Sequence, residues 1–352
     1  MKKILSVLFI LMLVPLCSIF YGANKDYEYT TTVEHLFTHC LLAYPSLAFS
    51  SDNPMRLDYN QDCITKDEFQ KILDSLYKND YCLVSLYDTF EKQGDIVVKK
   101  PVKVPIGKKA LVLSFDDVNY DHKKIGLGMV DKIIIDSSGN LATSTMVKGK
   151  EDISYSNEFI PMIENFVKKH PDFSPYGAKG TINITGYDGI LGYRTQSKNT
   201  KTRQQELEKA KKVVAKLKEN GWNFASHSYG HYHMKNLTDQ QFLEEVTLWE
   251  NEVEPLVGET KVYVYPYGEW QVFDNYGNIS KKHQYLIDAG FEIFCGVGMK
   301  TFFSYLPNKN NHKVLFMDRK VIDGNTLRRK DANLYPFFDP ANVYDYSVRP
   351  SV

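Results

Sequence analysis

The chain has 352 residues, of which 43% are hydrophobic and 24% are charged. Such a composition is typical of a globular protein with a sizeable core, folded as one large domain or two ordinary ones. The 43 basic residues balance the 43 acidic ones, and neither sign forms a long block. This balance argues against nucleic acid or anionic lipid as the main partner.

An export signal is predicted at the N-terminus. Lys2 and Lys3 precede a nearly unbroken apolar run over residues 4–20, which a short polar segment follows. These are the parts of a secretory signal. We therefore expect residues 1–23 to be a signal peptide or an N-terminal membrane anchor, with membrane contact only through this segment. Residues 24–352 are then the exported domain, which lies outside the cell or at its surface.

Strands and helices are predicted to alternate along the exported part. Strand patterns occupy residues 36–43, 81–86, 110–115, 179–184, 222–225, 262–265, 291–296 and 314–322. Helical patterns follow residues 65, 202 and 238 and cover 157–169 and 281–289. N-terminal caps are predicted for three of these helices from Thr65 with Glu68, Thr202 with Gln205, and Thr238 with Gln241. Residues 132–146 predict a β-hairpin.

This alternation predicts an α/β fold. Seven or eight parallel strands that alternate with helices form a closed or nearly closed barrel. We therefore predict a distorted (β/α)7–8 TIM-like barrel with a surface β-hairpin insertion, whose core motifs span residues 110–325. In such barrels the active site lies at the C-terminal ends of the strands.

The exported part has only four cysteines, which is few for a secreted protein. We therefore expect no disulfide framework to support the fold. Cys82 and Cys295 lie in apolar, strand-like runs, and we predict that both are buried thiols.

Two adjacent carboxylates, Asp116 and Asp117, follow the apolar strand 110–115. Neighbouring carboxylates repel each other, and apolar surroundings raise the cost of ionising both. A helix cap or a surface turn could explain the pair, but folding alone gives no reason to place it here. A bound divalent metal would remove the repulsion.

A histidine pair, His227 and His231, follows strand 222–225. Together with Asp117, the pair provides three protein ligands and leaves an open position for water, as in a catalytic zinc site. The pair could also lie in an exposed loop, but its position at a strand end, like that of the carboxylates, favours a shared site. A zinc-protease motif is excluded because it needs a glutamate directly after the first histidine, where this chain has Ser228.

Three motifs resemble those of the polysaccharide deacetylase family, also called the NodB homology family. In chain order they are Ser114-Phe115-Asp116-Asp117, His227-Ser228-Tyr229-Gly230-His231 and Tyr265-Pro266-Tyr267-Gly268. Residues 179–181 and 189–195 add to the similarity, which covers residues 33–330.

The resemblance implies a hydrolase that removes N-acetyl groups from an N-acetylhexosamine polymer of a bacterial cell wall or exopolysaccharide. It implies that Asp117, His227 and His231 hold a divalent metal, usually zinc in this family. It further implies that Asp116 is the general base toward the water that this metal binds.

The third motif is implied to bind the substrate. The backbone N–H of Tyr267 would donate to the oxyanion of the reaction, and such a donor is commonly worth ~10²–10³ in rate. Pro266 and Gly268 on either side would contact the substrate.

Two features of the family are missing. An arginine that braces the catalytic aspartate is expected two residues before Pro266, but Val264 stands there. Arg194 and Arg319 are candidates to replace it. The late Leu-x-His motif that supplies the general acid is also absent, and His312 lies in a stretch that predicts a loop.

His35 and His39 form a second pair with the same spacing. On a strand, residues four apart are separated by ~13 Å, so the two cannot share one metal. One of them could line the barrel mouth, and the alternative is a histidine satisfied within the core.

Two other interpretations remain open from the sequence. An enzyme with the same fold and metal could act on O-acetyl esters or on a non-sugar amide. Alternatively, the chain could be a glycan-binding surface protein that has lost most turnover, as the missing arginine and late histidine favour. The retained Asp116 argues against binding alone, because binding needs no base.

Overall fold

The computed structural model describes residues 26–299, 303–305 and 314–350. The predicted export signal, residues 1–23, and His312 lie outside these ranges. Within them, no helix combines the length and the apolar character needed to cross a membrane.

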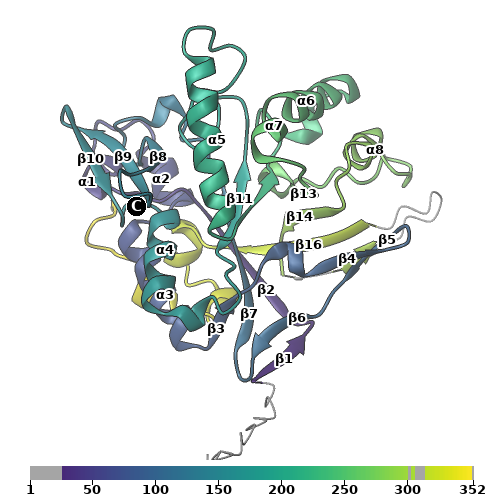
Figure 1. The fold of residues 1–352 in the computed structure, drawn as a ribbon, viewed down its shortest axis with the longest axis horizontal. Helices are drawn as coiled ribbons and strands as arrows, with labels where there is room; N and C mark the ends of the chain where they lie inside the picture. Colours follow the sequence, from purple (N-terminus) through teal and green to yellow (C-terminus); the bar gives the residue numbers. More distant parts are fainter. Residues whose placement is uncertain (1–25, 300–302, 306–313, 351–352) are drawn as a thin grey trace, which may run out of the picture.

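Seven parallel strands close into a barrel (Figure 1). In order around the barrel they are β2 (Val33–His39), β7 (Lys109–Asp116), β11 (Gly180–Ile184), β12 (Trp222–Ser226), β13 (Val262–Val264), β14 (Ile293–Val297) and β16 (Val314–Val321). The pairing of β16 with β2 closes the ring. Each strand lies beside the strand that precedes it in the chain, so the predicted TIM-like barrel is confirmed.

The remaining strands extend the barrel or form small sheets. They are β3 (Tyr81–Leu83) beside β7, β15 (Phe303–Tyr305) beside β16, the pair β1 (Tyr27–Thr30) and β6 (Val102–Pro105), the pair β4 (Phe90–Gln93) and β5 (Ile96–Lys99), and a sheet of β8 (Lys132–Ile135), β9 (Leu141–Val147) and β10 (Lys150–Ser154). The predicted hairpin is therefore a three-stranded sheet. Its third strand, β10, was missed because four of its five residues are polar.

The helices lie outside the ring of strands (Figure 1). They are α1 (Pro45–Ala48), α2 (Arg56–Asp62), α3 (Lys66–Lys78), α4 (Phe159–Lys169), α5 (Arg203–Glu219), α6 (Asp239–Glu252), α7 (Glu254–Val257), α8 (Lys281–Asp288), α9 (Gly324–Arg328) and α10 (Pro340–Val343). The capping boxes predicted at Thr65 and Thr238 are confirmed. The cap predicted at Thr202 is wrong, because its side chain bonds to Asn199 and leaves the helix end uncapped.

Along each strand, side chains point alternately into the barrel and away from its interior. Apolar side chains that fill the interior include Val33, Val112, Val264, Cys295 and Met317. On β7 and β16 the same alternation continues to Ser114, Asp116 and Arg319, so the interior becomes polar toward the C-terminal ends. The four cysteines of the described part are buried free thiols, as predicted for Cys82 and Cys295.

Candidate active site

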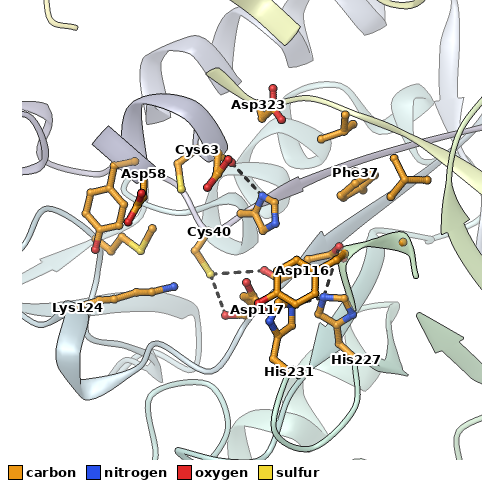
Figure 2. Close-up of a pocket in the computed structure, with 18 of the residues that line it drawn as sticks. Phe37, Cys40, Asp58, Cys63, Asp116, Asp117, Lys124, His227, His231 and Asp323 are labelled. Carbon is orange, nitrogen blue, oxygen red and sulfur yellow. Dashed lines mark hydrogen bonds and ion pairs between the residues drawn. The ribbon is translucent and has the colours of Figure 1, made fainter. Parts of the chain in front are cut away.

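A cavity of about 560 Å³ opens at the C-terminal ends of the barrel strands (Figure 2). The predicted site residues that line it are Asp116, Asp117, His227, His231, Tyr267 and Gly268. Pro266 is buried and begins the turn that carries the last two of them. The three motifs thus meet in one cavity, although they come from three different strand ends.

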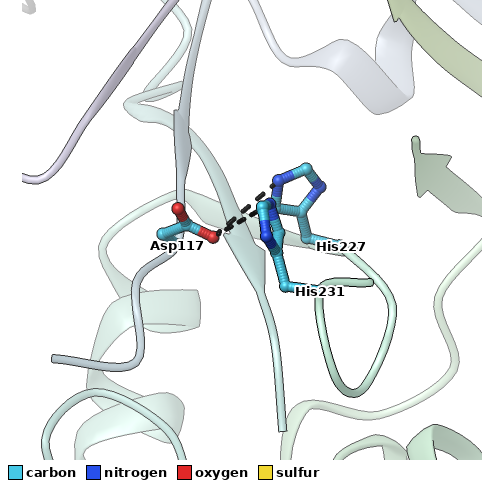
Figure 3. A group of neighbouring side chains, drawn as sticks. All are labelled: Asp117, His227 and His231. Carbon is cyan, nitrogen blue, oxygen red and sulfur yellow. Dashed lines mark ion pairs between the residues drawn. The ribbon is translucent and has the colours of Figure 1, made fainter. Parts of the chain in front are cut away.

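Asp117, His227 and His231 form a compact group of potential metal ligands (Figure 3). One ligand atom from each lies within 4.8 Å of the other two. The Nε2 atom of His231 is 3.5 Å from Oδ1 of Asp117, and the Nε2 atom of His227 is 3.9 Å from the same oxygen. Two imidazole nitrogens and one carboxylate are a donor set that suits zinc.

The protein holds both histidine rings ready to bind a metal. The Nδ1 atom of His227 is 2.9 Å from the backbone carbonyl oxygen of Val264, so Nδ1–H donates there and Nε2 faces the site. Such a contact fixes the tautomer of a metal ligand. Burial lowers the pKa of His231 to about 4, which keeps its ring neutral at physiological pH. Val264 thus orients His227 through its backbone carbonyl, whatever its side chain.

Two buried carboxylates of α6 hold the loop between these histidines. Oε2 of Glu245 accepts a hydrogen bond of 2.6 Å from the backbone N–H of Gly230. Oε2 of Glu252 accepts one of 2.8 Å from the hydroxyl of Tyr229. Sequence reasoning missed both, although acidic residues seven apart on a helix with apolar neighbours were a usable signal.

Left-handed backbone conformations occur in all three motifs. The φ angles are 62° at Asp117, 60° at Ser228, 54° at His231 and 57° at Tyr267. Residues other than glycine rarely adopt positive φ, and such strain tends to persist at functional sites. Three of these four residues, Asp117, His231 and Tyr267, line the cavity.

Asp116 is buried and forms a side-on ion pair with Arg319. Nη1 of Arg319 is 2.7 Å from Oδ1, and Nη2 is 2.9 Å from Oδ2. Asn183 on β11 adds a hydrogen bond of 2.5 Å to Oδ1. Burial alone would raise the pKa of Asp116, but the charges of Arg319 and His227 outweigh it and hold that pKa well below its usual range.

Arg319 on β16 thus fills the place of the arginine that is missing from β13. The other candidate, Arg194, is engaged elsewhere: Nη1 lies 3.0 Å from Oδ2 of Asp188, and Nη2 donates to the carbonyl of Tyr120. Alternation along β16 indicated the face of the wall on which Arg319 lies, but not its partner. Arg319 continues the interior-facing alternation of Leu315 and Met317, so its side chain had to enter the barrel.

His35 and His39 occupy different levels of the barrel. His39 lines the cavity, and its Nδ1 is 2.9 Å from the backbone carbonyl oxygen of Asp62. In the sheet, His39 is the direct partner of Asp116. His35 is buried deeper, where its Nε2 is 2.8 Å from the hydroxyl of Ser114. His39 therefore lines the barrel mouth, whereas His35 is a core histidine that is hydrogen-bonded through Nε2.

Tyr267 places a broad aromatic surface at the mouth of the cavity. Its side chain is 56% exposed and stacks on the ring of His233 at a centroid distance of 3.8 Å. Glu269 fixes that histidine, with Oε1 3.0 Å from its Nδ1. A flat ring pair beside a polar cavity suits contact with the apolar face of a sugar ring.

Comparison with known proteins points to one family. Residues 191–286 match the family described as polysaccharide deacetylase, over a range that contains the second and third motifs. The predicted resemblance to this family is confirmed. It is a family of enzymes, carbohydrate esterases and amidohydrolases.

Several solved structures match this chain over most of its length. The Streptococcus pyogenes deacetylase PplD in complex with acetate has 13% sequence identity and a TM-score of 0.44, covering 84% of this chain and 93% of that chain. IcaB from Ammonifex degensii has 14% identity and a TM-score of 0.43, with the same coverage. A de-N-acetylase from Aggregatibacter actinomycetemcomitans has 13% identity and a TM-score of 0.43, covering 87% and 98%. No curated protein matches the sequence significantly.

Proposed function

We propose that this protein is a metal-dependent hydrolase that removes N-acetyl groups from an N-acetylhexosamine polysaccharide. One observation carries the proposal. A three-residue ligand group lies beside a buried, arginine-paired carboxylate, Asp116, in a single cavity at the C-terminal ends of the strands. A protein that only binds glycans needs neither the carboxylate nor its arginine.

Asp117, His227 and His231 would hold the metal, most simply zinc. Their donor atoms fit such an ion in type and in spacing, and the backbone carbonyl of Val264 orients the ring of His227. When bound, a zinc ion supplies Lewis acidity that polarises a carbonyl and lowers the pKa of water toward ~7.

Asp116 would act as the general base. Its pKa is low enough to keep the carboxylate ionised throughout the physiological range, and Arg319 and Asn183 fix its orientation. In the reaction, water adds its oxygen to the acetamide carbon and gives one proton to Asp116. The C–N bond then breaks, so that acetate and a sugar amine are the products.

His39 would supply the proton that the departing amine needs, in place of the absent late histidine. Its Nδ1–H donates to the carbonyl of Asp62, which leaves Nε2 as the atom that can carry a proton toward the cavity. Its register opposite Asp116 puts acid and base on neighbouring strand ends. General acid catalysis of this kind typically contributes ~10²–10⁴ in rate.

The third motif would receive the substrate. The backbone N–H of Tyr267 would donate to the oxyanion, while the ring of Tyr267 and the turn at Gly268 contact the sugar. The exposed stack of Tyr267 on His233 supports a carbohydrate substrate over a small amide. We further propose that the protein acts outside the cell, on cell-wall or exopolysaccharide glycan, because its N-terminal sequence has the pattern of an export signal.

The test is acetate release from chitooligosaccharides and acetylated wall fragments by the zinc-loaded protein. We expect release by the wild type and its loss in Asp116→Asn, which removes the base and keeps the side-chain volume. Equal zinc content in both proteins would show that the variant lost the base and not the metal. Wild-type protein that binds zinc and glycan but releases no acetate from any substrate would refute the proposal and favour a glycan-binding role.

A further inference from the structure

A chain of polar contacts runs through the barrel interior below Asp116. His35 on β2 touches Ser114 on β7, with Nε2 2.8 Å from Oγ. Nη1 of Arg319 on β16 is 3.3 Å from the same Oγ and 2.7 Å from Asp116. All four residues are at most 2% exposed. Three neighbouring strands of the barrel, β16, β2 and β7, thus share one buried network.

Arg319 is held on every side of its guanidinium. Nε donates to the carbonyl of Gly296 at 3.3 Å, and the ring of Phe37 lies 3.9 Å from the central carbon. Together with the contacts to Asp116 and Ser114, these partners use all three nitrogens. Because a guanidinium is rigid and planar, a contact at one nitrogen restricts the positions of the other two nitrogens.

Chemistry fixes the direction of one of these hydrogen bonds. Arg319 can only donate, so the Ser114 oxygen accepts from it. The bond between Ser114 and His35 runs either way: the hydroxyl donates to Nε2, or Nε2–H donates to the hydroxyl oxygen, according to the tautomer of His35. Burial and then the charge of Arg319 lower the pKa of His35 well below its usual value, so the ring is neutral and can accept.

Packing of the barrel interior does not by itself explain a histidine at position 35. The residues level with His35 and below it are mainly apolar. An apolar side chain at His35 would suit them, but it would take from the buried Ser114 hydroxyl its contact with the ring. Nδ1 of His35 has no hydrogen-bond partner in the part of the chain that the structure describes. The contact with Ser114 is thus the polar contact that a histidine provides at this position.

We propose that Ser114 and His35 are positioning residues that set the orientation of the Arg319 fork and, through it, the carboxylate of Asp116. The proposal rests on the proposed function, because Asp116 is the base in that reaction. Neither residue lines the cavity or belongs to the group of potential metal ligands. Their effect should therefore fall on kcat and leave KM and zinc affinity unchanged.

The test is a double-mutant cycle with Ser114→Ala and Arg319→Lys on the zinc-loaded protein. We expect Ser114→Ala to lower kcat by ~2–10-fold, the range that one lost hydrogen bond predicts. In the Arg319→Lys background the same change should have little further effect on kcat, because the guanidinium that Ser114 orients is absent. Ser114→Thr, which keeps the hydroxyl, and His35→Gln, which keeps a polar atom near Nε2, should recover most of the activity lost in Ser114→Ala and His35→Met.

Val112→Ala is the matched control, since it trims an interior side chain opposite His35 that is outside the network. Independent effects of Ser114→Ala and Arg319→Lys, or a loss no larger than that in the control, would overturn the proposal. A crystal structure of Ser114→Ala tests the positioning role independently of the proposed function. We expect one contact of the fork with Asp116 to lengthen beyond hydrogen-bond distance; an unchanged fork overturns the proposal even if no substrate is ever turned over.

Discussion

Arg319 and Asp116 face each other across the mouth of the barrel, with two nitrogen–oxygen contacts of 2.7 and 2.9 Å, although 203 residues separate them in the chain. Their strands, β16 and β7, are not neighbours, because β2 lies between them. The arginine therefore reaches over the interior face of β2, where the ring of Phe37 supports it. The arginine that pairs with Asp116 in this chain therefore comes from β16 and not from β13.

This pairing makes Arg319 sensitive even to a conservative change. Lysine keeps the charge but has no planar fork, so Arg319→Lys loses the two-contact geometry with Asp116. We expect kcat for acetate release to fall ~10–100-fold while zinc affinity stays the same. Steady-state kinetics beside zinc titration would measure both. Arg194→Lys is the control, because that arginine pairs with Asp188 and not with Asp116.

Removing the charge should affect folding as well. Arg319→Met leaves the buried carboxylate of Asp116 without its partner, and breaking a buried ion pair in this way typically lowers the free energy of unfolding by ~3–5 kcal/mol. Denaturant unfolding of the metal-free protein measures the change. A variant as stable as the wild type would show that Asp116 has access to water, contrary to its burial.

The role proposed for His39 depends on the leaving group. His39→Gln should lower acetate release from an N-acetyl sugar by ~10²-fold or more, since an amine cannot leave without a proton. An aryl acetate with an acidic phenol needs no such proton, and its hydrolysis should hardly change. Equal losses on both substrates would contradict the acid role. His122→Gln is a suitable control, because this histidine is largely exposed and absent from the cavity lining.

The α6 carboxylates offer a test of the metal site that does not depend on activity. Glu245→Gln weakens the contact to the N–H of Gly230 and should loosen the turn that carries His231. Loss of an outer-shell contact commonly lowers metal affinity by ~10–100-fold. Competition titration with a zinc chelator measures this directly. Glu244→Gln changes the exposed neighbour on the same helix and should leave the affinity unaltered.

The barrel and the residues that gather in its cavity were predictable because local patterns encode them. Apolar runs separated by capped helices specify the alternation of strands and helices, and Asp117 and His231 follow strand ends in recognisable motifs. Strand limits were less accurate: the predicted strand 36–43 is Val33–His39 in the structure. The apolar run continues past His39 into the loop before α1, so hydrophobicity alone could not mark where pairing with β7 stops.

The replacements for the missing family features could not be assigned from sequence. Choosing Arg319 over Arg194, or His39 over His35, requires knowing which strand ends meet across the barrel and how far each side chain lies from its mouth. Both depend on how the barrel closes, which it does by pairing β16 with β2 at Lys320 and Leu36. Alternation gives the face of the wall that a residue occupies, but its depth in the barrel follows only from the register.

A buried carboxyl outside the site, Glu158, predicts how stability depends on pH. Its Oε1 accepts hydrogen bonds from the N–H groups of Leu41 and Phe159, and it thereby ties the segment after β2 to the start of α4. Burial raises the pKa of Glu158 from 4.5 to about 8, against the lowering effect of those N–H groups. The folded protein therefore keeps a proton there that the unfolded chain has lost.

Because the folded-state pKa is raised, this stability is fully present below pH 4.5 and is lost as the pH rises toward 8. Glutamine resembles the protonated carboxyl, so Glu158→Gln should remove this part of the dependence. We expect the variant to match the wild type near pH 5 and to be more stable near pH 9 by ~1–3 kcal/mol. Urea unfolding at the two pH values, with the exposed Glu208→Gln as control, measures the difference. A variant that loses stability equally at both would show that Glu158 is ionised in the folded protein and that its charge, not its proton, holds the two segments together.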